Sequence, residues 1–141
     1  MSAPAQEGDR IEPIVTPENE RYWRSARAHA LELPYCLACE QPFYPPQHRC
    51  PRCLADRIDW RRVSGRGRVY SWIVMHQVYD PSFKDRAPYP VAVIELEEGP
   101  RLVTNLVEVQ NDAIRLDMPV RAVYDDLNDE IALVQFTPEA G

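Results

Sequence analysis

The chain has 141 residues, of which 45% are hydrophobic and 27% charged, and its formal net charge is −6. This length suffices for one modest core, or for one core beside a small unit held by a metal. No run approaches the 18 apolar residues of a membrane helix, and an acidic chain is a poor match to the phosphate backbone of nucleic acids.

Residues 1–15 show no periodicity and are predicted to form a flexible tail. A helix is predicted to follow within residues 16–33, because Thr16 is a favourable N-cap and Pro17 suits the first helical position. It should end near Leu31, shortly before the next proline.

The predicted helix carries two features of functional interest. Arg21, Arg24 and Arg27 are spaced three residues apart, so they line one side of the helix and form either a solvated face or a contact for phosphate groups. Tyr22 and Trp23 lie on another side. A helix outside a barrel has little core of its own, so these rings must bury against the ribbon, the barrel or another subunit.

Four cysteines form two Cys-x-x-Cys pairs separated by ten residues: Cys36, Cys39, Cys50 and Cys53. This spacing is typical of a tetrahedral zinc site, and it predicts a rubredoxin-like ribbon over residues 34–59. Because four thiolates fill the coordination shell, the zinc should be structural rather than catalytic.

Iron of the rubredoxin kind and a pair of disulfides remain open as alternatives to zinc. Disulfides belong to secreted chains, and residues 1–20 hold no apolar segment of a signal peptide, so a cytoplasmic protein with reduced thiols is expected. A redox-active pair would need a βαβ setting, which the surrounding prolines exclude. His48, close to the cysteines, is interpreted as an exposed loop residue.

From residue 60 onward the pattern changes to alternation of apolar and polar residues. The expected strands are residues 68–78, 89–97, 101–109, 120–124 and 131–136, with residues 60–63 as a lead-in strand. In the first of these, Tyr70, Trp72 and Val74 should share one face and Val69, Ser71 and Ile73 the other. Five or six short antiparallel strands in residues 60–141 favour a small closed barrel of the OB type.

The segment 79–90 joins two of these strands and is too long for a simple hairpin. Three prolines stiffen it, and it carries Tyr79, Phe83 and Tyr89. Rigid aromatic residues are enriched in protein interfaces, which favours a docking loop over one that packs on its own barrel. Trp23 on the helix is expected to belong to the same surface.

A capped N-terminal helix, a Cys₄ zinc ribbon and a C-terminal OB-fold barrel, in this order, make a mainly β chain that resembles the bacterial and archaeal zinc-ribbon/OB-fold proteins accompanying acyl-CoA enzymes. The glycine usual after each knuckle is replaced here by Glu40 and Leu54. The segments that carry the resemblance, besides the cysteines, are residues 67–72, 87–102, 118–120 and 136–138.

The resemblance implies an accessory subunit without chemistry of its own, bound to a sterol-carrier-type thiolase, a steroid side-chain retro-aldolase or a hydratase, in a complex with two copies of each subunit. It also implies a role in assembling the complex and in shaping or sharing its CoA channel. If Arg21, Arg24 and Arg27 contact phosphates rather than solvent, those of coenzyme A are the expected ones. A nucleic-acid-binding module and an autonomous acyl-CoA carrier are the alternatives. The first is disfavoured by charge, since residues 60–141 hold nine basic and thirteen acidic residues.

Overall fold

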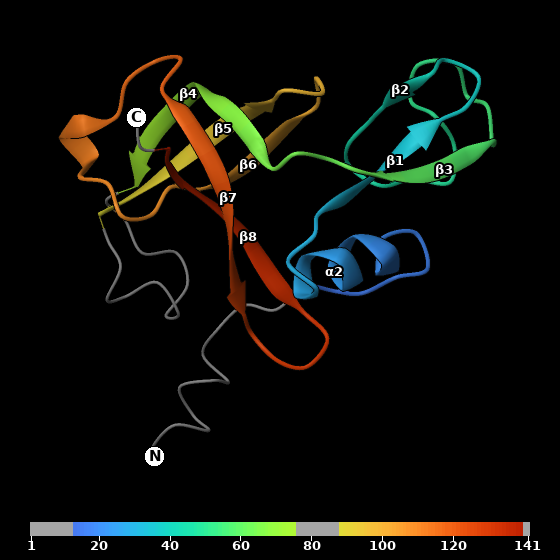
Figure 1. The fold of residues 1–141 in the computed structure, drawn as a ribbon, viewed down its shortest axis with the longest axis horizontal. Helices are drawn as coiled ribbons and strands as arrows, with labels where there is room; N and C mark the ends of the chain where they lie inside the picture. The colour runs from blue at the N-terminus through green and yellow to red at the C-terminus, as the bar shows by residue number, and fades with distance from the viewer. Residues whose placement is uncertain (1–12, 76–87, 140–141) are drawn as a thin grey trace.

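A computed structural model describes residues 13–75 and 88–139 (Figure 1). Its elements, in chain order, are α2 (Glu20–Arg27), β1 (Glu32–Cys36), β2 (Gln41–Pro42), β3 (Ile58–Arg62), β4 (Arg66–Met75), β5 (Tyr89–Leu96), β6 (Arg101–Asn105), the 3₁₀ turn η2 (Asn111–Ala113), β7 (Pro119–Asp126) and β8 (Ala132–Pro138). Over these residues the fold is mainly β, with one short α-helix, a cysteine ribbon and a nearly closed barrel, as the sequence predicts.

The helix is shorter than predicted at both ends. Thr16 does not cap it: Thr16 and Asn19 form a preceding turn, in which the backbone N–H of each donates to the other's side chain at 2.7 and 3.3 Å. At the other end His29 has a positive φ of 58°, and Ala30 N donates to the Ser25 carbonyl at 3.0 Å. This Schellman-type ending stops the helix at Arg27.

The ribbon is a three-stranded antiparallel sheet in the order β2-β1-β3. The expectation that residues 60–63 lead into the barrel is wrong, because Trp60 pairs with Pro34 and Arg61 with Leu33 of β1. Val63 continues this pairing by donating to the Leu31 carbonyl at 3.0 Å. The strand that follows the second knuckle therefore completes the ribbon and only then passes into the barrel.

The barrel is a five-stranded sheet in the order β6-β5-β4-β7-β8. A single parallel bridge between Leu106 and Phe136 brings its two outer strands together, and Thr104 Oγ1 donates to the Val134 carbonyl across the same seam at 2.6 Å. β5 alternates as predicted, with Ala92, Ile94 and Leu96 buried.

The face assignment predicted for residues 68–78 fails at a bulge in β4. Val69 pairs with Ile94, but the next pair is Ser71 with Val93, so Tyr70 is an extra residue in the strand. Such an insertion exchanges the two faces beyond it. Val69 and Trp72 therefore both pack on the core, whereas the side chains of Tyr70 and Ile73 are exposed.

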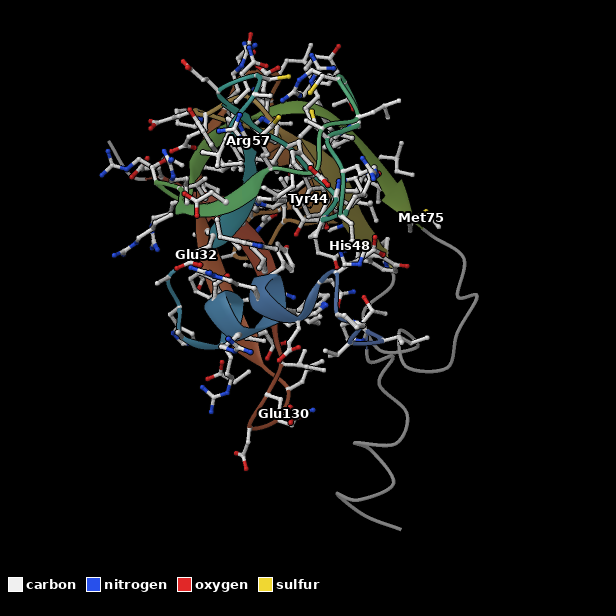
Figure 2. The ribbon with its side chains drawn as sticks, turned by 90° about the vertical axis from the view of Figure 1, so that its right-hand side faces the viewer. Glu32, Tyr44, His48, Arg57, Met75 and Glu130 are labelled. Carbon is white, nitrogen blue, oxygen red and sulfur yellow. The ribbon has the colours of Figure 1, made fainter. Side chains whose placement is uncertain are left out.

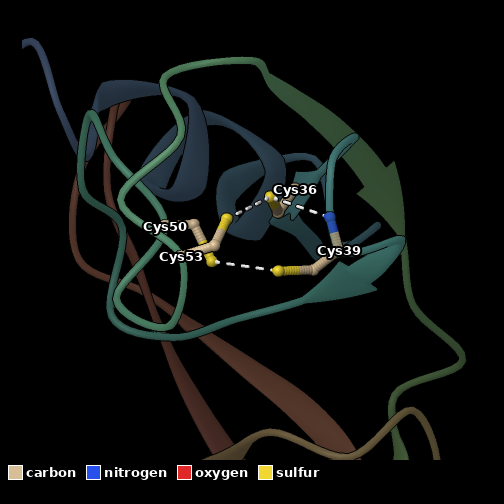
Figure 3. Close-up of side chains that lie close together, drawn as sticks. All are labelled: Cys36, Cys39, Cys50 and Cys53. Atoms are coloured by element: carbon tan, nitrogen blue, oxygen red, sulfur yellow. Dashed lines mark hydrogen bonds between the residues drawn. The ribbon is translucent and has the colours of Figure 1, made fainter.

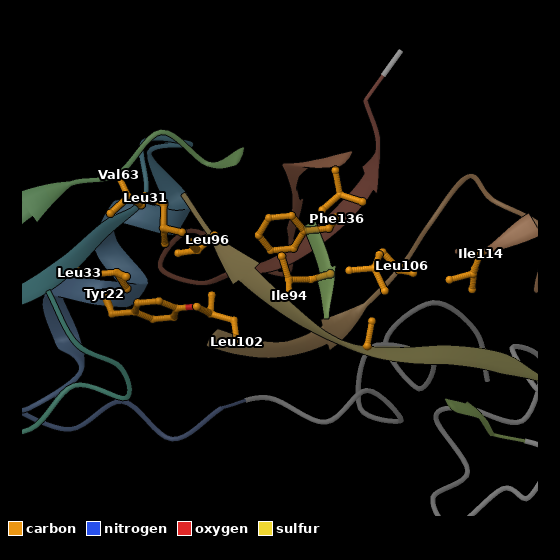
Figure 4. Packing of buried hydrophobic residues seen from close by; sticks show 13 residues of the cluster. Tyr22, Leu31, Leu33, Val63, Ile94, Leu96, Leu102, Leu106, Ile114 and Phe136 are labelled. Atoms are coloured by element: carbon orange, nitrogen blue, oxygen red, sulfur yellow. The ribbon is translucent and has the colours of Figure 1, made fainter. Parts of the chain in front are cut away.

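One hydrophobic core joins the helix, the ribbon and the barrel (Figure 4). Tyr22 from the helix, Leu33 from β1 and Phe136 from β8 are all buried in it. The question of where the helix aromatics bury is thus answered for Tyr22, which packs within its own chain and contacts Tyr44 of the ribbon with 5.6 Å between ring centroids. A second, smaller cluster around Phe43 fills the ribbon itself.

Candidate metal centre and subunit surface

The two cysteine pairs lie on matching turns of the ribbon. Cys36 ends β1, and Glu40 N donates to the Cys36 carbonyl at 2.7 Å; Leu54 N donates to the Cys50 carbonyl at 2.8 Å in the same way. Glu40 and Leu54 have positive φ values of 59° and 65°. Both knuckles therefore keep the left-handed turn that glycine would adopt without strain.

These turns bring the four sulfurs together, all within 4.8 Å of one another (Figure 3). The Sγ atoms of Cys36 and Cys53 are 3.6 Å apart, and those of Cys39 and Cys50 are 3.8 Å apart. In a tetrahedron with zinc–sulfur bonds of about 2.3 Å, neighbouring sulfurs lie about 3.8 Å apart. The spacing matches a Cys₄ zinc site and is far too long for disulfide bonds of about 2.05 Å.

The electrostatics of the cluster also favour a cation. The neighbouring Cys53 thiol and burial raise the pKa of Cys39 to about 12. Burial works in the same direction at Cys50, but N–H groups of Cys53 and Arg52 outweigh it and lower the pKa of Cys50 to about 6. Crowded thiols thus cannot all ionise unaided, whereas zinc binds all four as thiolates.

The four cysteines form a closed structural zinc site, with no position left for substrate. His48 lies apart from it: its side chain is 71% exposed, and Nε2 is 3.8 Å from the Glu18 carboxylate. Backbone N–H groups of Cys39 and Arg52 point at the sulfurs of Cys36 and Cys50, at 3.3 and 3.4 Å. These contacts orient the ligands for the metal.

The three helix arginines all have carboxylate partners within the chain. Arg21 Nε is 2.8 Å from Glu32, and Arg24 is 2.6 Å from Glu20 one turn earlier. Arg27 reaches the β7–β8 hairpin, where its Nε donates to the Asn128 carbonyl at 2.7 Å. Only Arg24 thus combines an exposed position with a purely local ion pair.

Trp23 lies at a groove of about 440 Å³ between the helix and the β7–β8 hairpin. The groove is lined by Val15, Glu20, Trp23, Arg24, Arg27, Ala28, Asp129 and Glu130. The ring of Trp23 packs partly on the core, and its Nε1–H is buried without an acceptor among the residues that the structure describes. Figure 2 places Glu130 at the far tip of this hairpin, beyond the helix.

The other predicted interface residues fall at the edge of the described chain. Tyr79 and Phe83 lie outside the described residues. Tyr89 begins β5, pairs with Met75 and is half-buried. The structure therefore brings Trp23, Arg24 and Arg27 together at one groove, and it shows Tyr89 on a different element. Among residues 13–75 and 88–139, no helix has the length and apolar character needed to cross a membrane.

Comparison with known proteins identifies both halves of the chain. Residues 23–59 match the family described as the rubredoxin-like zinc ribbon domain of ChsH2, and residues 60–125 match the C-terminal OB-fold domain of ChsH2. A solved chain from an Ltp2–ChsH2(DUF35) aldolase superposes with a TM-score of 0.80 at 37% identity, covering 90% of this chain and 98% of that one.

Two relatives extend the comparison. A DUF35 domain-containing scaffold protein of Methanothermobacter thermautotrophicus is 35% identical over 80% of this chain and 86% of its own length. A probable enoyl-CoA hydratase alpha subunit of Thermomonospora curvata is 38% identical over 92% of this chain, but the match spans only 40% of that protein. The chain belongs to the zinc-ribbon and OB-fold family that includes ChsH2 and the DUF35 scaffold proteins.

Proposed function

We propose that this chain is a non-catalytic accessory subunit of an enzyme complex that acts on acyl-CoA thioesters, with a thiolase-like or aldolase partner. The observation that carries the proposal is the match over almost the whole of a chain from an aldolase complex. The assignment of all four cysteines to zinc supports it, because no thiol is left as a nucleophile.

A further relative supports a proposal for the substrate class. One of them is a 3-oxo-4,17-pregnadiene-20-carboxyl-CoA hydratase alpha subunit of Mycobacterium tuberculosis, 30% identical over 90% of this chain and 42% of that protein. We therefore propose a cytoplasmic role in steroid, lipid or related acyl-CoA metabolism, in which the subunit stabilises its partner and shapes the CoA channel. Two copies of each subunit are expected in the complex.

Within this proposal, Arg24 is the best placed of the three helix arginines to contact a CoA phosphate. Its partner Glu20 is exposed, and exposed ion pairs contribute little stability, so exchange for a phosphate costs little. Arg27 would have to leave both Asn128 and Asp126. Arg21 would have to leave Glu32 and the face of Trp60, 5.9 Å from its guanidinium carbon.

The test is reconstitution with a co-expressed thiolase-like or aldolase protein encoded beside this chain. The purified subunit should give no turnover of acyl-CoA thioesters, whereas the mixture should exceed the activity of the partner alone. Native mass spectrometry should give two copies of each subunit. Turnover by the subunit alone, or failure to form a complex with any such partner, would contradict the proposal.

The proposed docking surface, Trp23, Tyr79, Phe83 and Tyr89, has its own test. Replacing Phe83 and Tyr89 by Ala should weaken partner binding about thirtyfold, since truncation of a buried interface aromatic typically costs about 2 kcal/mol. Leu116→Ala is the control, because Leu116 is 64% exposed on a different segment. Unchanged affinity in the double variant, with zinc content and fold intact, would place the interface elsewhere.

A further inference from the structure

A cavity of about 230 Å³ lies where the ribbon passes into the barrel, and its lining is strongly basic. We refer to it as the arginine cavity; its polar lining residues are His29, Arg62, Ser64, Arg66, Arg121, Tyr124 and Glu139. Three arginines and one glutamate thus line it, on a chain whose net charge is −6. A cluster of basic residues around a cavity creates a local positive potential, which favours anions even on an acidic protein.

The strand register places two of these arginines in direct opposition. Arg66 of β4 pairs with Arg121 of β7, so the two side chains leave the same face of the sheet. Like charges directly opposite each other destabilise an antiparallel pair. Glu139 lies 3.4 Å from Arg66, but Arg62 and Arg121 have no carboxylate partner among the described residues. Arg62 lies opposite Glu32 in the β1–β3 ladder, but that carboxylate is 2.8 Å from Arg21. The cavity therefore holds more positive than negative charge.

The hydroxyl groups of the cavity add donors rather than acceptors. Tyr124 Oη accepts the Leu31 N–H at 3.3 Å, and Ser64 Oγ accepts the Arg66 N–H at 3.0 Å. Each hydroxyl thus keeps its own proton, which has no acceptor within residues 13–75 and 88–139. Tyr124 packs on the core side of β7 whereas Arg121 leaves the other side, so Ser64 is the hydroxyl donor that accompanies the arginines. His29 is already bonded to Asp126, and the Glu98 carboxylate is held by Ser64 N.

We propose that the arginine cavity binds a phosphate or diphosphate group, held by Arg62, Arg66 and Arg121 with the hydroxyl of Ser64 as a further donor. Guanidinium groups present paired N–H donors that match phosphate oxygens, and three arginines with a serine hydroxyl around one hollow favour an oxyanion as the ligand. This site is separate from the helix arginines, each of which already has a carboxylate partner. The binding site stands on this geometry alone; naming coenzyme A as the source of the phosphate rests on the proposed function.

The first test is titration of the zinc-loaded full chain with inorganic pyrophosphate, followed by calorimetry and by NMR shifts. One saturable site is expected, with shifts concentrated at residues 62–66 and 121–124. Arg62→Gln and Arg121→Gln should each weaken binding about tenfold. Arg57→Gln is the matched control, since it removes the same charge from an exposed position in the ribbon (Figure 2) and should change affinity less than twofold.

A stability measurement separates binding from misfolding. Because Arg121 opposes Arg66 in the free protein, Arg121→Gln should leave the melting temperature without phosphate unchanged or higher. At the same pyrophosphate concentration, it should also show a smaller rise in melting temperature than the parent chain, because its affinity is about tenfold lower. Arg62→Gln lies outside the barrel sheet and repeats the test should Arg121→Gln disturb the fold.

Competition then identifies the source of the phosphate. Displacement of pyrophosphate by coenzyme A but not by pantetheine, which has no phosphate, would assign the site to the thioester ligand; failure of both to compete would assign it to a free phosphate compound. No saturable binding, or equal losses in Arg57→Gln and Arg121→Gln, would overturn the site. Loss of partner binding without any phosphate binding would instead make it a protein contact. Because the titrations use the chain alone, their failure would leave the subunit role untouched.

Discussion

The Nε2 atom of His29 and the Oδ1 atom of Asp126 lie 2.9 Å apart, so the residue just after the helix is tied to the end of β7. The same imidazole ring stacks on Tyr124, with 4.8 Å between centroids and 9° between planes. The hydrogen bond from His29, with the Arg27 charge nearby, lowers the pKa of Asp126. The helix is thereby held to the hairpin through a charged contact.

This contact predicts a pH dependence of stability. A carboxyl group whose pKa is lowered by folding stabilises the native state above its unfolded pKa of about 3.9 and loses that contribution as pH falls through the lower folded value. Asp126→Asn should therefore be less stable than the parent at pH 6, and the gap should close below about pH 4. Denaturant titrations of both chains across this range would measure it. A constant gap would contradict the charged contact.

Zinc should be present at close to one ion per chain, with Cys36, Cys39, Cys50 and Cys53 as ligands. Cys36→Ser should lose most of the metal and unfold the ribbon, since binding of a structural zinc supplies about 10–16 kcal/mol in small domains. Elemental analysis of untagged protein is the measurement. His48→Ala is the control and should retain the metal. A folded, metal-free chain with two disulfides would exclude the site.

Leu54→Gly should stabilise the protein. Leu54 has a φ of 65°, so glycine at this position relieves the strain of the left-handed backbone conformation. Leu54 is also 67% exposed, so its replacement loses little packing. The gain should be about 0.5–1 kcal/mol, after allowance for the greater freedom of glycine in the unfolded chain. Leu116→Gly offers a contrast: Leu116 is similarly exposed but lacks a positive φ, and this variant should be destabilised. Equal effects in denaturant unfolding would show that no strain is stored at Leu54.

Gly67→Ala should destabilise the barrel by about 1–3 kcal/mol. A Cβ at this position would lie 2.5 Å from the Glu95 carbonyl oxygen and 2.9 Å from Ile94 Cγ2, where the backbone of β5 leaves no room. Ser71→Ala on the same strand points to solvent and should have little effect. Thermal unfolding of the two variants would separate them, and equal stability would mean that β5 shifts to accept the methyl group.

The features predicted correctly are those that depend on local spacing. The two-residue gap in each cysteine pair brings its two sulfurs to one site. The alternation of apolar and polar residues in β5 and β7 determines which residues face the core. The errors in the two sheets concern partners distant in sequence. Nothing near Trp60 indicates that it pairs with Pro34, and the bulge at Tyr70 becomes visible only against Ile94 and Val93.

The same limit applies to the functional residues. Arg21, Arg24 and Arg27 are conspicuous by their periodic spacing, yet Arg21 and Arg27 pair with groups outside the helix, Glu32 and Asn128. No sequence pattern links Arg66 and Arg121, because 54 residues separate them and only the sheet register brings them opposite each other. Once the register of two strands is known, a pair of like charges opposite each other would indicate a candidate site for a counter-ion.

The junction of β6 and β8 is the place where the barrel is held together by the fewest backbone hydrogen bonds. The four neighbouring strand pairs of the sheet are antiparallel ladders, the shortest of which, β4–β7, has three residue pairs. Among the described residues, the junction of β6 and β8 is made by one bridge, the Val107 N–H to the Phe136 carbonyl at 2.9 Å, and one threonine hydroxyl. Local opening follows the places where the fewest backbone hydrogen bonds must break. The barrel should therefore open first between β6 and β8. A ligand or partner that binds across these two strands would stabilise the folded barrel.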